Sequence, residues 1–389
     1  MTNSAAPDRD ATEIHASALV IDTHADTPQR FVDESWDFTA PLGHGHLNLA
    51  TARQGNLGAE FFAIWPEPSA WRGRFAERTR ALIDGVLEQV RRHPDSLALC
   101  TSPAEILAAR AAGKFAVLMG IEGGHAIENS LELLRSFYGL GVRYMTLTWA
   151  NSNDWADSSG DLDDASVLHQ NGLTRFGREV IAEMNRLGMI IDVSHVSDKT
   201  LADVLAVTRA PVLASHSCAR ALSDSPRNLT DDQLRAIAAT GGAVMVNFYS
   251  AFVDENYRRA VLTIKAERSA AHDALAAEYA AKSETIPFAA SNQIDRDFAA
   301  RLHRPPFESL IAQFDHILRV AGIDHVGIGT DFDGISSMPE GIDSAADLPK
   351  ITAALVARGY SAADLRKVLG GNLMRVFAEV QRAAPPPPL

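Results

Sequence analysis

The sequence predicts an α/β protein, a (β/α)8 TIM-type barrel built as a single domain. The chain has 389 residues, which is enough for one large barrel. Short apolar runs rich in β-branched residues alternate with longer segments of helical periodicity, and this alternation is typical of the fold. A doubly wound open sheet is the alternative, but the Gly-x-Gly-x-x-Gly turn expected after its first strand is missing.

Eight apolar runs are expected to form the barrel strands. Helical spacing fills several of the intervals, as in Ala76–Arg92 and Thr174–Leu187. A further helix is expected over Thr230–Thr240, where Thr230 suits the N-cap position and two glycines follow the last turn. The predicted strands are Leu19–Thr23, Ala59–Ile64, Phe115–Gly120, Tyr144–Thr148, Met189–Val193, Val212–Ser215, Ala243–Phe248 and Val326–Gly329.

The barrel domain is expected to span residues 14–382, between a polar N-terminal tail (1–13) and a proline-rich tail (383–389). Residues 254–303, between the seventh and eighth strands, are charged and rich in alanine, and they predict an inserted helical segment. At the C-terminal mouth of a barrel such an insertion would serve as a lid or contact surface. A helical decoration without a functional role is the other interpretation.

Composition limits the classes of partner. The net charge of −13 argues against nucleic acid or an anionic membrane. No apolar stretch approaches the roughly 18 residues of a membrane span. The polar N-terminus lacks the regions of a secretory signal, so we expect a cytoplasmic protein, or an exported one if a signal was removed. Cys100 and Cys218 are the two cysteines, which implies no disulfide framework and leaves one bridge open.

Imidazole and carboxylate side chains directly follow five of the predicted strands. An isolated His-x-Asp pair is usually a polar strand end, but the carboxyl ends of all barrel strands open on one face. Their repetition therefore predicts a metal centre at that face, and these ligand types suit zinc. The residues concerned are His24 and Asp26 after the first strand, Glu122 after the third, His195 after the fifth, His216 after the sixth and Asp331 after the eighth.

This inventory suits two metal ions rather than one. Glu122 is flanked by glycines and can bridge two ions, since each carboxylate oxygen has its own lone pairs. A water held between the ions would be acidified to a hydroxide nucleophile. Asp331 would accept its proton and pass it to a leaving group. Asp333 precedes a glycine in a turn signal, so one of the two aspartates suffices for catalysis.

At these residues the chain resembles the membrane (renal) dipeptidase family, zinc peptidases of barrel fold within the amidohydrolase group. The resemblance runs from about His15 to Val380 and leaves out the tails and the insertion. The matching blocks are Ile21–Asp26, Gly120–Gly123, Asp192–His195, Ser215–Ser217, Gly329–Gly334, Pro339–Gly341 and Gly371–Phe377.

The resemblance implies a binuclear zinc site and a dipeptide substrate, with a homodimer as a possible assembly. Arg227 matches an arginine that grips the C-terminal carboxylate of the dipeptide, a role that a guanidinium fork suits. Tyr249 matches a tyrosine of the pocket wall, and Asp331 the acid/base. The implied ligands are His24, Asp26 and Glu122 on one ion, and Glu122, His195 and His216 on the other.

One position departs from the family. Trp149 stands where the family carries a histidine that helps to polarise the scissile carbonyl. An indole donates one hydrogen bond and cannot be protonated, and loss of such a donor typically costs roughly 10²–10³ in turnover. The residues that could substitute for it are His125, Asn151, Asn153 and His169.

The leading hypothesis is therefore a zinc-dependent dipeptidase in which manganese or cobalt could occupy similar sites. An N-acyl amino acid hydrolase, or another amide or lactone hydrolase on the same metals, is the alternative that Trp149 raises. A metal-binding barrel without catalysis is the third reading, which retention of the ligands and Asp331 disfavours.

Overall fold

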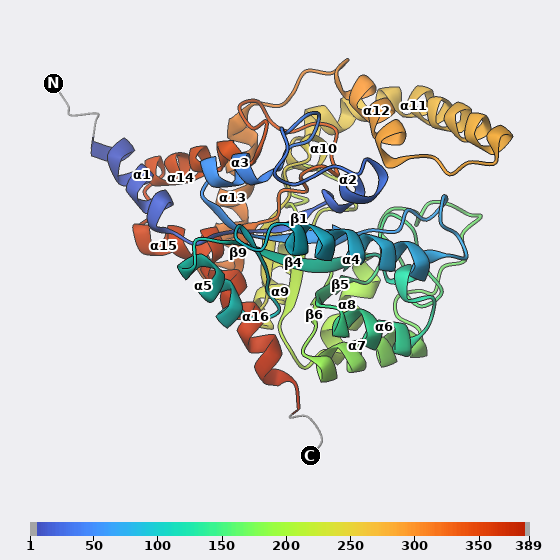
Figure 1. Ribbon diagram of the computed structural model, residues 1–389, viewed down its shortest axis with the longest axis horizontal. Helices are drawn as coiled ribbons and strands as arrows, with labels where there is room; N and C mark the ends of the chain where they lie inside the picture. The colour runs from blue at the N-terminus through green and yellow to red at the C-terminus, as the bar shows by residue number, and fades with distance from the viewer. Residues whose placement is uncertain (1–5, 386–389) are drawn as a thin grey trace.

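A closed ring of eight parallel strands forms the centre of the structure, a computed structural model that describes residues 6–385 (Figure 1). The ring order is β1-β2-β4-β5-β6-β7-β8-β9, and Asp22 pairs with Ile328 to join β1 to β9. Closure confirms the barrel and excludes the doubly wound sheet. The strands are β1 Val20–Ala25, β2 Leu57–Ile64, β3 Leu97–Leu99, β4 Phe115–Glu122, β5 Val142–Thr146, β6 Ile190–Asp192, β7 Val212–Ser217, β8 Ala243–Val246 and β9 Val326–Ile328.

Each of the eight predicted runs supplies one strand of this ring, with ends displaced by up to two residues. The sequence analysis missed β3, which pairs with the beginning of β4 on the edge that β5 occupies further along. Its three residues, Leu97–Leu99, include no β-branched side chain, so they carry little strand signal.

Helices surround the ring, as a barrel requires. Thr230 caps α9 as predicted: its hydroxyl accepts from the Gln233 amide, and the Gln233 side chain accepts from the Thr230 amide. The α-helices are α1 Ala6–Ser17, α2 Pro28–Asp33, α3 Leu49–Gln54, α4 Phe75–Arg92, α5 Pro103–Ala111, α6 Leu131–Gly139, α7 Arg175–Leu187, α8 Asp198–Val207, α9 Asp231–Ala239, α10 Ser250–Val253, α11 Glu255–Lys282, α12 Phe288–Ala299, α13 Phe307–Ala321, α14 Leu348–Ala357, α15 Ala362–Arg366 and α16 Asn372–Ala383.

The N-terminal segment expected as a polar tail forms helix α1 from Ala6 onward. Buried His15 anchors this helix, since its ring nitrogens lie 2.7 Å from the Thr352 hydroxyl and 2.8 Å from the Gly55 carbonyl. Most of the predicted proline-rich tail, residues 386–389, lies outside the described residues. The two cysteines are buried and unbridged. Within the described chain, no helix combines the length and apolar character needed to cross a membrane.

The floor of the barrel is apolar and lies beneath the strand ends. Alternation along the strands turns Phe61 and Tyr144 inward, where their ring centroids lie 5.1 Å apart. Phe377 of α16 packs against Phe61 at 6.2 Å. Gly120 is required here, because a Cβ would lie 2.0 Å from the Tyr144 ring. The side chains that fill this end of the barrel are therefore mainly apolar.

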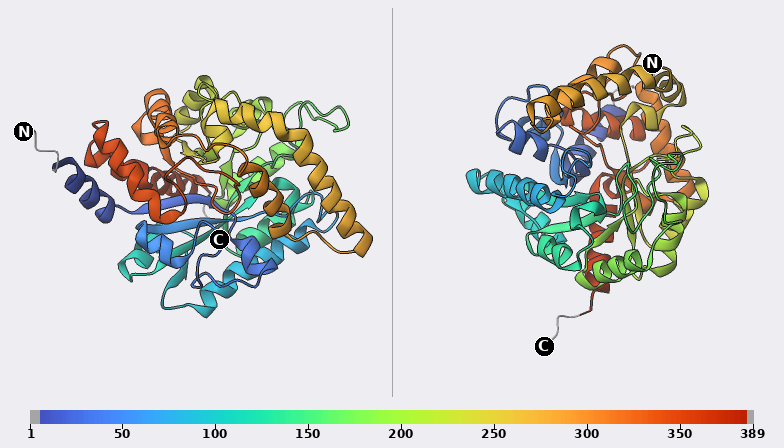
Figure 2. Two further views of the ribbon diagram at one scale, coloured as in Figure 1. Left: turned by 90° about the horizontal axis from the view of Figure 1, so that it is seen from above. Right: turned by 90° about the vertical axis from the view of Figure 1, so that its right-hand side faces the viewer.

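The predicted insertion between the seventh and eighth barrel strands is helical. Helices α11 and α12 pack against each other and project from one side of the molecule, away from the C-terminal end of the chain (Figures 1 and 2). Helix α12 returns to contact α2. The Asn292 side chain of α12 donates to the Asp333 carbonyl at 3.3 Å, so this helix reaches the loop that follows β9.

Candidate metal centre and active site

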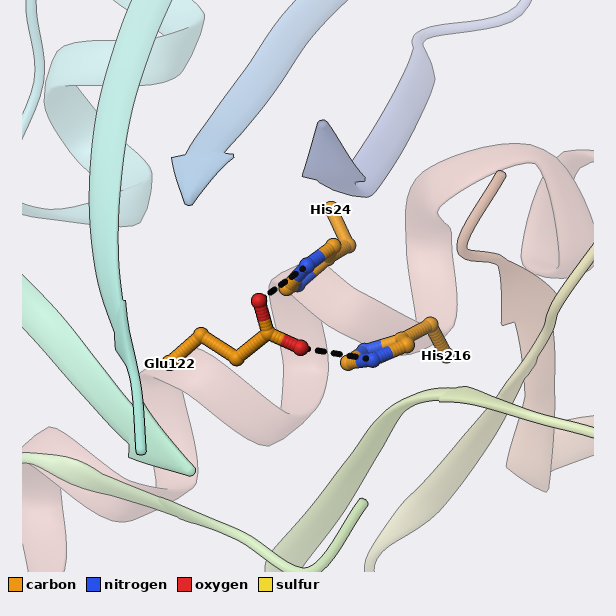
Figure 3. Close-up of side chains that lie close together, drawn as sticks. All are labelled: His24, Glu122 and His216. Carbon is orange, nitrogen blue, oxygen red and sulfur yellow. Dashed lines mark ion pairs between the residues drawn. The ribbon is translucent and has the colours of Figure 1, made fainter. Parts of the chain in front are cut away.

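Glu122 stands between imidazoles from different strands at the carboxyl end of the barrel (Figure 3). Its Oε2 lies 3.4 Å from His24 Nε2. Its Oε1 lies 3.4 Å from His216 Nε2 and 2.9 Å from His195 Nε2. The two oxygens of one carboxylate thus face two separate sets of imidazole nitrogens.

A second group shares His24 with the first. Ligand atoms of His24, Asp26 and Asp331 lie within 4.8 Å of one another, and His24 Nε2 is 3.6 Å from Asp26 Oδ2. The Asn247 amide donates to Asp331 Oδ2 at 2.9 Å. All six residues predicted from the strand ends therefore lie in one cluster.

The convergence of His24 and Asp26 does not arise from simple strand alternation. Strand β1 ends at Ala25, and its pairing with β2 shifts register between Asp22 and Ala25. This irregularity redirects the side chains at the strand end, as bulges near active sites do. Only pairing with the neighbouring strand specifies such a shift.

Two cluster residues have left-handed backbone. His195 has φ +68° and Asp331 has φ +64°, a region that costs a non-glycine residue about 1–3 kcal/mol. Tertiary hydrogen bonds hold both: the Asp331 amide donates to the His24 carbonyl at 3.0 Å, and the Ser159 amide to the His195 carbonyl at 2.8 Å. The surrounding loops impose these conformations.

Hydrogen bonds behind the cluster determine which imidazole nitrogens face it. The Tyr144 hydroxyl lies 3.1 Å from the Thr23 carbonyl, to which it donates, and 2.8 Å from His24 Nδ1. Because its single proton is used on that carbonyl, the hydroxyl accepts from His24 Nδ1–H. Nε2 of His24 therefore faces Asp26 and Glu122. Burial alone would lower the pKa of His24, but Tyr144 and these two carboxylates raise it well above its usual value.

His216 is oriented in the same way from another strand. The Ser215 hydroxyl donates to Asp192 Oδ2 at 2.6 Å and lies 2.7 Å from His216 Nδ1. It therefore accepts from Nδ1–H and leaves the Nε2 lone pair toward Glu122.

The imidazole and carboxylate atoms of the cluster are arranged as the ligands of a metal ion would be. Nε2 of His24 and Nε2 of His216 each face carboxylate oxygens, and a divalent cation between these atoms would take the place of the proton on His24 Nε2. His24 Nε2 and Asp26 Oδ1 are buried without a hydrogen-bond partner among residues 6–385. A donor set of imidazoles and carboxylates is that of zinc and related divalent ions. The cluster fits such ions.

Burial and neighbouring charges shift the pKa values within the cluster in opposite directions. Burial raises the pKa of Asp26 to about 8. Burial and the Arg227 guanidinium lower the pKa of His195 to about 4, so its imidazole is neutral at pH 7. Burial alone would raise the pKa of Glu122, but His24 and hydrogen bonds from His195 hold it well below its usual value. The bridging position therefore keeps a carboxylate.

Arg227 is buried beside the cluster. Its Nη1 donates to the Ser217 hydroxyl at 2.7 Å and its Nη2 to the His216 carbonyl at 2.6 Å. Its Nε is buried without a partner among the described residues. A guanidinium has five N–H donors, so donors remain for an incoming carboxylate.

The other two predicted pocket residues are Tyr249 and Trp149. The half-buried Tyr249 packs edge-on against Phe252 at 4.9 Å. Burial raises its pKa to about 12, and the positive charge of Arg268 in α11 partly offsets this effect. Trp149 lies against the cluster, with its ring 6.3 Å from the His195 imidazole.

The candidates to replace the missing family histidine are mostly engaged by loop backbone. His169 is the exception: its Nδ1 lies 4.0 Å from Asp157 Oδ1. The other contacts are His125 to the Pro66 carbonyl at 2.8 Å, Asn151 to the Ser152 carbonyl at 3.3 Å and Asn153 to the Leu147 carbonyl at 2.9 Å.

The structure separates the two aspartates that follow β9. Asp333 accepts from the His46 amide at 2.6 Å and from the Thr27 hydroxyl at 2.7 Å, so its carboxylate holds neighbouring loops. Asp331 instead belongs to the cluster. Sequence reasoning missed the residues that orient the cluster, although their strand positions were a usable signal; they are Tyr144, Asp192, Ser215 and Asn247.

Comparisons with known proteins agree with this geometry. Residues 8–387 match the family described as membrane dipeptidase (Peptidase family M19). Human Dipeptidase 3 is 33% identical over 379 residues, which cover 96% of this chain and 67% of that protein. The crystal structure of the probable dipeptidase PvdM from Pseudomonas aeruginosa is 28% identical with a TM-score of 0.81, covering 98% of this chain and 100% of that one.

A second solved structure adds a ligand to the comparison. It is a metallopeptidase from Rhodobacter sphaeroides liganded with a phosphinate mimic of the dipeptide L-Ala-D-Ala. This protein is 27% identical with a TM-score of 0.74, and the match covers 93% of this chain and 99% of that one. The chain therefore belongs to the membrane dipeptidase family, Peptidase family M19, a family of metal-dependent dipeptidases.

Proposed function

We propose that the chain hydrolyses the peptide bond of dipeptides with a free C-terminal carboxylate and does so with two zinc ions. The observation that carries this proposal is the position of Glu122, whose two oxygens face different imidazoles. When bound, two divalent ions supply Lewis-acid polarisation of the scissile carbonyl and lower the pKa of a water molecule. The proposed ligands are His24, Asp26 and Glu122 for one ion, and Glu122, His195 and His216 for the other.

Asp331 is the proposed acid/base. Burial raises its pKa, which favours a carboxyl that takes up a proton and passes it on near neutral pH. Asn247 occupies Oδ2, so Oδ1 is the atom that would carry the proton to the leaving amine. Gly334 lies against both carboxylates: a Cβ added there would be 2.6 Å from Asp331 Oδ1 and 2.1 Å from Asp26 Oδ2. Asp331 Oδ1 therefore lies beside Asp26.

Arg227 is the proposed anchor for the substrate carboxylate. Its guanidinium is fixed by Ser217 and the His216 carbonyl, so little side-chain freedom is lost when a substrate binds. The similar metallopeptidase liganded with a phosphinate mimic of L-Ala-D-Ala supports a dipeptide substrate.

The test is a substrate panel on protein loaded with zinc. Free dipeptides should be hydrolysed, and the same dipeptides with an amidated C-terminus should not, because they offer Arg227 no carboxylate. N-acyl amino acids are included, and faster turnover of these would favour the alternative hydrolase. Glu122→Gln is the matched inactive control, since an amide retains one carbonyl oxygen only. Absence of turnover across all dipeptides contradicts the proposal.

A further inference from the structure

Three aromatic rings lie in series from the inserted helices to the metal cluster. The ring of Phe288, at the start of α12, lies 6.0 Å from that of Trp65. Trp65 lies 4.7 Å from Trp149, and Trp149 lies 6.3 Å from the His195 imidazole. Centroid separations of this size are those of interacting aromatic pairs. We call Phe288, Trp65 and Trp149 the aromatic wall.

The wall presents apolar surface beside the cluster. Trp65 is only 7% exposed and lies between the other two rings, whereas Trp149 and Phe288 are half-buried. An indole at position 149 adds apolar area where an imidazole would add a polar edge. Side chains of a substrate can therefore lose water against the two outer rings.

The order of the strands places Trp65, the middle ring of the wall, opposite Arg227, whereas Trp149 follows β5, two places from β7. Trp65 directly follows β2, and Arg227 lies in the loop after β7. In the closed ring of eight strands, β2 and β7 are four places apart in either direction, so their ends lie across the barrel mouth from each other. A dipeptide whose carboxylate is held by Arg227 would direct its N-terminal residue toward the wall.

We propose that the aromatic wall selects dipeptides whose N-terminal residue carries an aromatic side chain. This inference rests on the proposed function, because it needs a dipeptide anchored at Arg227. Phe288 comes from the insertion, so the inserted helix α12 supplies a specificity-determining residue to the barrel. Asn292 of the same helix is bonded to the Asp333 carbonyl and holds α12 against the loop that carries Asp331.

The experiment compares kcat/KM for L-Phe-L-Ala with that for L-Ala-L-Ala. Phe288→Ala removes one ring of the wall, and Phe298→Ala is the matched control on the same helix, where the Phe298 ring lies 4.8 Å from the Arg301 guanidinium. An aromatic pair is worth about 0.5–1.5 kcal/mol, so the ratio of the two kcat/KM values should fall about two- to tenfold in Phe288→Ala, mainly through KM. The ratio should be retained in Phe298→Ala.

Three results would overturn the inference. They are a wild-type preference for L-Ala-L-Ala, an unchanged ratio in Phe288→Ala, and an equal fall of the ratio in both variants. Each of these requires turnover, so each leaves the proposed function intact. Absence of turnover with both dipeptides would instead contradict the proposed function itself. Thermal unfolding of both variants excludes misfolding as the cause of a changed ratio.

Discussion

Tyr144→Phe removes a hydroxyl that orients one proposed metal ligand. The hydroxyl bridges the Thr23 carbonyl, at 3.1 Å, and His24 Nδ1, at 2.8 Å. Burial raises the pKa of Tyr144 well above its usual value, so the group stays protonated across the working pH range. The phenyl ring that remains still packs against Phe61 at 5.1 Å, and the barrel floor keeps its shape.

The size of the effect follows from the groups left behind. Both the Thr23 carbonyl and His24 Nδ1–H are buried and would lose their partner, at about 1–3 kcal/mol for each buried group left unpaired. Removing a hydrogen bond behind a metal ligand typically costs about 10–100-fold in metal affinity. Because Ser215 fixes His216 independently, only one of the two proposed ions should bind more weakly.

The assay is competition between the protein and a chromogenic chelator, which resolves the two binding steps. Tyr360→Phe is the matched control, because its hydroxyl also bonds to another side chain, Asp315 Oδ1 at 3.1 Å, far from the cluster in the fold. We expect one step to weaken in Tyr144→Phe and neither step in Tyr360→Phe. Wild-type affinity for both ions in Tyr144→Phe would refute the argument that this hydroxyl orients His24.

Three further substitutions test the roles of individual residues. Asp331→Asn should lower kcat about 10²–10⁴-fold with little change in KM, since an amide cannot carry the proton; steady-state kinetics that show the loss in KM instead would contradict the assignment. Arg227→Ala should raise KM for dipeptides about 10-fold or more, through loss of a charge-assisted hydrogen bond. Equal KM values of this variant for free and amidated dipeptides would show that the lost contact is the one to the substrate carboxylate. Trp149→His should raise kcat for L-Ala-L-Ala, because an imidazole donor would again face the scissile carbonyl; an unchanged kcat would show that another group already supplies that hydrogen bond.

Sequence reasoning reached the barrel because its strands are apolar, β-branched and regularly spaced, which local residue types determine. It missed β3, whose three residues are too few to show a periodic pattern. It also missed the first turns of α1, because their mainly polar residues show little helical periodicity. The cluster could be anticipated because His24, Glu122 and Asp331 each lie at the carboxyl end of a strand or within three residues after it, and a barrel brings such positions to one face.

The sequence by itself determined which side chains lie at the barrel mouth, because the apolar runs mark where each strand ends and the polar residues occupy those ends. Only the tertiary structure decided how they meet. The register shift in β1, the hydroxyl of Tyr144 behind His24, and the approach of Phe288 to Trp65 join residues from 37 to 223 positions apart in the chain. Such contacts depend on ring closure and on the path of the insertion, which no local pattern of residues specifies.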